Sequence, residues 1–107
     1  MVQSETVDVY RALVDPNRRR ILELLRDEDR SVLALGAHLP ITIGAVSQHL
    51  QLLRRSGLVS RTKQGKQRIY RLEAERLREI DAWLNEFRSF WEGSMDRFGQ
   101  YLDANNT

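Results

Sequence analysis

The chain has 107 residues, of which 41% are hydrophobic and 30% charged, a composition typical of one soluble globular domain. It contains no cysteine, which excludes a disulfide framework, a thiol nucleophile and a thiolate metal site. The net charge of +2 hides an asymmetry, because residues 30–72 carry eight basic side chains and no acidic one, whereas residues 1–29 and 73–107 carry net charges of −2 and −4.

Export and membrane insertion are not indicated. The first ten residues, MVQSETVDVY, lack the basic start and the apolar run of a secretory signal. No apolar stretch approaches the roughly 20 residues that a membrane-spanning helix needs. We therefore expect a cytoplasmic protein with no membrane partner.

The first third of the chain is predicted to form two helices. Apolar residues recur at helical spacing over residues 4–14, which predicts the first one. Asp15 and Pro16 are typical of an N-cap and a first helical position, so a second helix is expected from there to about Asp27. Within this second helix, Arg18 points toward the apolar side and is expected to pair with a carboxylate.

Two further helices are predicted in the block without carboxylates. Ser31 can cap a short helix that Pro40 closes, and Thr42 can cap a longer helix that Gly57 ends. On a helical wheel, the apolar face of the longer helix contains Ile43, Val46, Leu50 and Leu53. The opposite face is small and polar and consists of Gly44, Ser47, Gln48, Gln51 and Arg55, with Arg54 at its border.

Two strands and a long helix complete the chain. The strands are expected over residues 58–62 and 67–72, on either side of a four-residue turn that contains Gly65. From Glu73 onward, apolar residues repeat every seven positions, which predicts one amphipathic helix over residues 73–102. Gly93 is the weakest point of this helix.

A short helix, a tight turn and a capped helix with a polar face are typical of a helix-turn-helix. This chemistry fits the major groove of double-stranded DNA, because small and amide side chains can approach base edges and hydrogen-bond to them. The candidates for base contacts are Thr42, Gly44, Ser47, Gln48 and Gln51. The hairpin would act as a wing, and phosphate contacts are expected from Arg54, Arg55, Arg61, Lys63, Lys66 and Arg68.

These features also have plainer interpretations. A basic block can be a solvated surface, and Gln48 and Gln51 can be ordinary helix-forming residues that face water. A winged helix can also serve as a scaffold that binds an acidic protein and does not recognise DNA. We favour DNA because the block without carboxylates, the polar helix face and the basic hairpin occur together.

The aromatic residues indicate self-association. All three Phe and both Trp lie between Trp83 and Phe98. Five such side chains carry on the order of 1,000 Å², which exceeds the roughly 300–600 Å² apolar patch of a typical monomer. We therefore predict a two-fold dimer through the first and last helices, and an effector pocket among the aromatic residues is the alternative. The predicted interface residues are Val7, Tyr10, Leu77, Ile80, Trp83, Leu84, Phe87, Phe90, Trp91 and Phe98.

The sequence contains no residue pattern typical of a catalytic site or a metal site. The chain has no phosphate-binding glycine loop. Ser47 and His49 lie two positions apart on a predicted helix and do not face each other as nucleophile and base. His38 and His49 alone cannot close a metal site. We expect no catalytic residue, no metal and no cofactor, and we interpret His49 as a packing and hydrogen-bonding residue beside the core.

The chain resembles the ArsR-type winged-helix repressors of bacteria and archaea in three segments, ALVDPNRRRILELL, SVLALGAHLPITIGAVSQHLQLLRRSGLV and SRTKQGKQRIYRL. The tail, WLNEFRSFWEGSMDRF, resembles a branch of that family that lacks the metal ligands. Metal-sensing members carry a cysteine pair near the positions of Val32 to Leu35, or His and Asp ligands on the last helix. This chain has neither the cysteines nor a histidine after His49.

The resemblance implies a homodimer that binds a palindromic operator and represses transcription, often of its own operon. It also implies base contacts from Ser47, Gln48 and their neighbours. The expected fold is mainly α, a winged helix-turn-helix with four helices, a two-stranded β-hairpin wing and a long C-terminal dimerisation helix. We expect a single domain over residues 1–107, with the DNA-binding helices and the wing in residues 4–72 and the dimerisation helix in residues 73–102.

Overall fold

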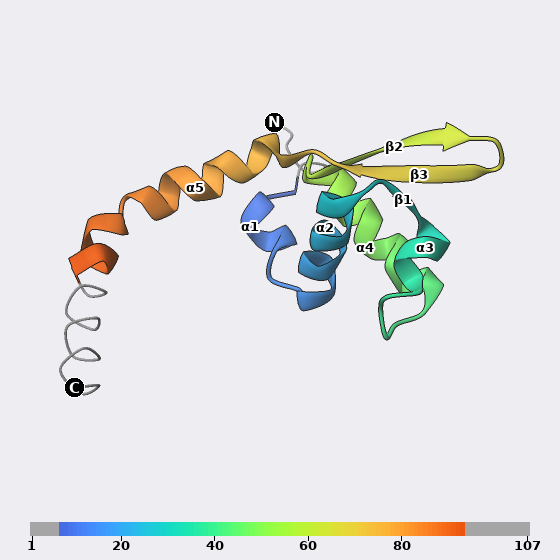
Figure 1. Cartoon of the computed structure of the whole chain (residues 1–107), viewed down its shortest axis with the longest axis horizontal. Helices are drawn as coiled ribbons and strands as arrows, with labels where there is room; N and C mark the ends of the chain where they lie inside the picture. The colour runs from blue at the N-terminus through green and yellow to red at the C-terminus, as the bar shows by residue number, and fades with distance from the viewer. Residues whose placement is uncertain (1–6, 94–107) are drawn as a thin grey trace, which may run out of the picture. The chain divides into compact units, whose positions relative to one another are not determined.

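The computed structural model describes residues 7–93, which are mainly helical with one small antiparallel sheet, as predicted (Figure 1). The chain forms two units, residues 1–77 and residues 78–107. The first unit contains α1 (Val9–Ala12), α2 (Pro16–Asp27), β1 (Arg30–Ser31), α3 (Val32–Gly36), α4 (Ile43–Arg55), β2 (Val59–Gln64), β3 (Gln67–Leu72) and η1 (Ala74–Leu77). The second unit begins with α5 (Arg78–Asn85).

Side-chain caps start α2, α3 and α4 where the sequence predicted them. Asp15 Oδ1 accepts hydrogen bonds from the amides of Asn17 and Arg18 at 2.7 and 3.2 Å. Ser31 and Thr42 each accept one amide hydrogen bond from three residues further along, at 3.2 and 3.1 Å. These bonds satisfy amide groups that have no carbonyl partner in the first turn of a helix, so the three starts are fixed locally.

Two helices are shorter than predicted. α1 was expected over residues 4–14, but it begins only after Asp8, whose carboxylate accepts the Tyr10 amide at 2.7 Å. α3 ends at Gly36 and does not continue to Pro40. The Ala37 amide still bonds the Leu33 carbonyl four positions back, but the amides of His38 and Leu39 bond carbonyls three positions back, so the chain tightens into turns at the buried Leu39.

The sheet has three strands in the order β1-β3-β2. β2 and β3 form the predicted hairpin, but they pair up to Gln64 and Gln67, so the connecting turn has two residues in place of the predicted four. Gly65 has φ of 63° at the first position of this turn, where a type II′ turn places glycine. β1 was not predicted, because a strand of two residues shows no periodicity.

The core lies between the helices and the base of the hairpin. The predicted apolar face of α4 is confirmed for Val46, Leu50 and Leu53, which are all 0% exposed. The prediction is wrong for Ile43, which is 42% exposed. Ile43 is the first residue of the helix, so it lies at the margin of the packed face.

The predicted continuous helix over residues 73–102 is wrong for its described part. The segment begins as the 3-10 helix η1, and α5 ends at Asn85. A turn follows at Glu86 and Phe87, whose amides bond carbonyls three residues back at 3.1 and 2.9 Å, and helical backbone resumes over residues 88–93. The interruption therefore lies at Glu86, seven residues before Gly93, which was the expected weak point. It occurs at Glu86 because the hydrogen bonds change there to partners three residues back. The predicted positions beyond residue 93 lie outside the described residues.

Gly57 ends α4 with φ of 80°. The Gly57 amide bonds the Arg54 carbonyl and the Leu58 amide bonds the Leu53 carbonyl, both at 3.0 Å, which is the pattern of a Schellman motif. A Cβ at position 57 would lie 2.9 Å from Cδ of Arg76. Glycine is therefore required here both by the backbone conformation and by the close approach of Arg76.

Replacing Gly57 with Ala should destabilise the protein by about 1–2 kcal/mol for the left-handed conformation, and further for the displaced Arg76 side chain. The midpoint of urea unfolding measures this loss. Gly65→Ala is the matched control, because Gly65 also has positive φ but its Cβ would have no neighbour within 4 Å. Equal losses in the two variants would contradict a role for Arg76 at this contact.

Candidate nucleic-acid interface

The five residues predicted to contact bases are all exposed: Thr42 is the N-cap of α4, and the helix itself carries Gly44, Ser47, Gln48 and Gln51. A Cβ at Gly44 would have only the Thr42 hydroxyl oxygen within 4 Å, at 3.9 Å. No other side chain therefore covers the backbone of Gly44, and another molecule can approach it. The Thr42 oxygen already accepts an amide hydrogen bond of its own helix, and its proton remains free to be donated. The helix therefore presents a shallow polar surface that the edge of a base can approach.

One hollow joins this helix face to the wing. It measures about 200 Å³ and is lined by Val32, Ser47, Gln48, Gln51, Arg61, Arg68 and Tyr70. Two amides, the Ser47 hydroxyl, the Tyr70 phenol and two guanidinium groups thus share a concave surface. The amides and the hydroxyl can hydrogen-bond base edges, and the guanidinium groups can contact phosphates.

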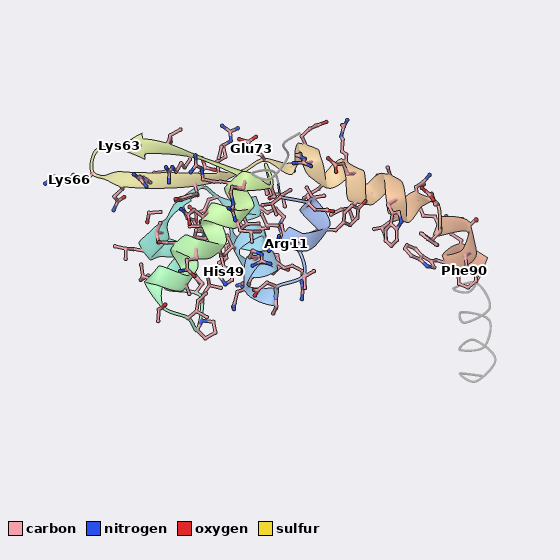
Figure 2. The ribbon with its side chains drawn as sticks, turned by 180° about the vertical axis from the view of Figure 1, so that it is seen from behind. Arg11, His49, Lys63, Lys66, Glu73 and Phe90 are labelled. Atoms are coloured by element: carbon pink, nitrogen blue, oxygen red, sulfur yellow. The ribbon has the colours of Figure 1, made fainter. Side chains whose placement is uncertain are left out.

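The wing holds its cations in two places. Lys63 and Lys66 lie near the tip of the hairpin and are exposed (Figure 2). Arg61 is half-buried and donates a hydrogen bond to the Tyr70 hydroxyl at 3.4 Å, which holds its guanidinium group beside the hollow. Arg68 is exposed and pairs in register with Lys63 on the neighbouring strand. The hairpin thus carries positive charge from the hollow to its tip.

Arg54 and Arg55 do not line the hollow that joins α4 to the wing. They occupy the last turn of α4 and, with Gln51, line a second hollow of about 310 Å³. The C-terminal end of a helix dipole favours cations, so both guanidinium groups are well placed there, and neither makes an ion pair with a carboxylate in the described part of the chain. Gln51 is the residue that the two hollows share.

Positive charge is left uncompensated on the wing. In residues 7–93, Lys63, Lys66 and Arg68 make no ion pair with a carboxylate. Glu73, the first acidic residue after the basic block, lies at the base of the hairpin, away from its tip (Figure 2), and accepts a hydrogen bond from the Ser60 hydroxyl at 2.6 Å. This arrangement keeps carboxylates away from the surface that would face a polyanion.

Arg18 ties α4 to the end of α1. Its guanidinium donates to the carbonyls of Ala12 and Arg11 at 2.8 and 3.2 Å, and its Nη1 lies 3.2 Å from His49 Nδ1. The predicted pairing of Arg18 with a carboxylate is met only by its charge interaction with Asp15, because the guanidinium directs its hydrogen bonds to carbonyls at the end of α1 and lies against His49. His49 is half-buried and has the hydrogen-bonding role predicted for it.

Asp15 completes this junction. Partial burial would raise the pKa of its carboxyl, but the amide hydrogen bonds from Arg18 and Asn17, together with the positive charges of His49 and Arg18, outweigh that effect and lower the pKa. His49 Nε2 lies 4.0 Å from Asp15 Oδ1. The cap of α2 therefore also provides a negative charge that faces the middle of α4.

A third contact, which sequence reasoning missed, holds the C-terminal end of α4. Arg76 Nη1 donates to the Ser56 carbonyl at 2.6 Å, and its stem covers Gly57. Ser56 itself is buried, and its hydroxyl donates to the Leu53 carbonyl at 2.7 Å. The partners lie 20 residues apart, so no local pattern could have indicated this contact.

The predicted dimer residues fall into three groups. Val7 is buried in its own protomer and its amide bonds the Arg55 carbonyl at 3.4 Å, so it offers little surface to a partner, contrary to the prediction. Leu77, Ile80 and Leu84 are half-buried. The exposed members are Tyr10, Trp83, Phe87, Phe90 and Trp91. Phe98 lies outside the described residues.

Aromatic rings of the second unit contact one another. The Trp83 and Phe87 rings meet edge to face with centroids 5.1 Å apart, and the Phe87 and Trp91 rings stack at 6.3 Å. Phe90, which is 70% exposed, is the most exposed of the large aromatic side chains described (Figure 2). Such a cluster of exposed rings is typical of a surface that a partner covers.

In residues 7–93, no group of three or more His, Asp or Glu side chains is placed to hold a metal ion. His38 is exposed, and His49 is engaged with Arg18. Over the same range, none of the helices has the length and apolar character that crossing a bilayer requires.

Comparison with known proteins gives a consistent result. The family model described as bacterial regulatory protein, arsR family, matches residues 15–61. An HTH-type transcriptional regulator of Mycobacterium tuberculosis is 33% identical over 95 residues, which cover 89% of this chain and 86% of that protein. The transcriptional repressor SdpR of Bacillus subtilis is 30% identical over 80 residues, which cover 75% of this chain and 89% of the repressor.

A solved structure agrees with these sequence matches. It is the solution structure of a homodimeric winged helix-turn-helix DNA-binding domain from Mycobacterium bovis, described as a possible ArsR-family transcriptional regulator. The TM-score is 0.61 at 28% identity, and the match covers 76% of this chain and 75% of that domain.

Proposed function

This chain belongs to the arsR family of bacterial regulatory proteins, and we propose that it is a homodimeric repressor that binds a palindromic operator in double-stranded DNA. The observation that carries the proposal is the hollow in which Ser47, Gln48 and Gln51 of α4 lie beside Arg61 and Arg68 of the wing. Its place of action would be the cytoplasm, where bacterial chromosomal DNA lies.

In this proposal α4 enters the major groove with its polar face toward the bases. Gln48 and Gln51 can each form two hydrogen bonds to the N6 and N7 atoms of adenine, and Ser47 can serve either a base or a phosphate. Arg61 and Arg68 then contact the phosphates that border the groove, while Lys63 and Lys66 extend along the backbone from the hairpin tip. The base contacts select a sequence, and the cations supply most of the affinity.

Two protomers would place their α4 helices in successive major grooves, about 34 Å apart, so the operator should consist of two inverted half-sites. The exposed aromatic residues of the second unit support such a pairing. The homodimeric relative from Mycobacterium bovis supports it independently.

The direct test is to sequence the DNA fragments that the purified protein retains from fragmented genomic DNA. We expect an inverted repeat, and we expect the region upstream of the chain's own gene among the fragments if it regulates itself. Gel shift on that region follows. A protein that retains no sequence in preference to others, and binds random duplex DNA without salt dependence, would instead be a protein-binding scaffold.

Replacing Gln48 with Ala should weaken binding to the operator by about 1–3 kcal/mol and leave binding to random DNA nearly unchanged, because the lost contacts are to bases. Titration of both duplexes at one salt concentration measures the two affinities. Lys63→Gln is the contrasting variant, because loss of a phosphate contact should weaken both affinities by a similar factor. A Gln48→Ala variant that weakened both alike would remove Gln48 from the base-contact residues.

A further inference from the structure

We propose that Ile43 helps to determine the operator sequence by contacting the 5-methyl group of a thymine in each half-site. The inference rests on the proposed function and adds to it a base preference at one position. It assigns a role to a residue whose exposure contradicts the core position expected from the helical wheel.

Ile43 lies where a recognition helix meets base edges. It is the first residue of α4, and it is 42% exposed between two exposed neighbours, Thr42 and Gly44. The N-terminal residues of a recognition helix are those that contact bases in the major groove. Thymine presents a methyl group there, and apolar side chains recognise it by contact. A branched apolar side chain at this position should therefore favour thymine over the other three bases, whose major-groove edges offer only polar groups.

Gly36 holds Ile43 in this position. A Cβ at Gly36 would lie only 2.4 Å from Cδ1 of Ile43, so the end of the isoleucine side chain occupies the space that the missing Cβ leaves at the end of α3. One side of Ile43 is thus seated on α3 while the other faces outward. A side chain that is already seated loses little rotamer freedom on binding, which favours a defined contact.

The experiment replaces each thymine of the selected operator, one pair of symmetric positions at a time, with deoxyuridine, which lacks only the 5-methyl group. For the wild-type protein we expect one pair at which affinity falls about fourfold per half-site, the effect of burying one methyl group. At the other thymines the replacement should change affinity less than twofold. Affinities are measured by fluorescence anisotropy with the full chain.

Two variants and one control identify the residue that responds to the methyl group. Ile43→Ala should bind the thymine and deoxyuridine operators equally. Gly36→Ala should also lose the discrimination although Ile43 remains, because the new Cβ displaces the end of its side chain. Alanine favours a helix more than glycine, so this variant should fold. Val14→Ala is the control, since Val14 is an exposed apolar residue between α1 and α2 and should leave the discrimination intact.

The possible results separate the inference from the function on which it rests. A wild-type protein that selects an operator but responds to no methyl group overturns the role of Ile43 and leaves the repressor proposal intact. Retained discrimination in Ile43→Ala overturns it as well. Failure to select any operator overturns the proposed function, and the inference with it.

Discussion

Raising the salt concentration from 50 to 200 mM should weaken operator binding about a thousandfold or more. Residues 30–72 carry eight basic and no acidic side chains, and six of these cations are candidates for phosphate contacts in each protomer. Each phosphate that a cation neutralises releases bound counterions, so the logarithm of affinity falls linearly with that of salt, by about 0.9 per contact. A dimer with roughly 6–10 such contacts loses about 10³–10⁵ in affinity over this range. Gel shift or anisotropy titrations at four salt concentrations give the slope.

The slope can be traced to the wing with a double variant. Lys63→Gln with Lys66→Gln removes up to two contacts per protomer, so the slope for the dimer should become shallower by about 3–4. Arg20→Gln is the matched control, because Arg20 lies on α2 outside the basic block and pairs with Glu23 at 3.4 Å. A slope that changed equally in the control, or not at all in the double variant, would contradict phosphate contacts from the hairpin tip.

The parts of the fold that could be predicted are those with local causes. Asp15, Ser31 and Thr42 each cap a helix through a bond to an amide within three residues, so their chemistry is visible in the sequence. Likewise, Leu50 and Leu53 follow from helical periodicity alone. Gly57 marks the end of α4 because few other residues adopt its backbone conformation without strain.

The missed features depend on contacts between different elements of the fold. β1 exists only because Arg30 and Ser31 pair with β3, about 40 residues later. Ile43 is exposed because it begins α4 at the margin of the packed face, where contact with Gly36 of α3 covers only one side of its side chain. For the candidate site, the wheel and the charge pattern supplied candidate residues, but only the packing of α4 against the wing shows which of them line one hollow, and that Val32 and Tyr70 join them.

Replacing Phe90 with Glu should dissociate the proposed dimer and weaken binding to the full operator by about 100-fold or more. A dimer binds its second half-site at an effective concentration in the millimolar range, and a monomer loses that advantage. Affinity for an isolated half-site should stay unchanged, because α4 and the wing are untouched. Phe90 is 70% exposed, so the substitution removes little packing within the protomer, while it places a charge in the proposed apolar interface.

Two measurements separate dimer loss from misfolding. The solution mass should fall from about twice 12.5 kDa to that of one chain, while the circular dichroism spectrum and the half-site affinity stay as in the wild type. Val14→Glu is the matched control, because Val14 is 73% exposed but is not among the predicted interface residues.

If the Phe90→Glu protein kept both its dimeric mass and its full-operator affinity, the aromatic cluster around Phe87 would not be the dimer contact, and the exposed rings would be left for another ligand. If only the mass fell and operator affinity did not, a single α4 with its wing would suffice for recognition, and the inverted-repeat operator would lose its structural reason.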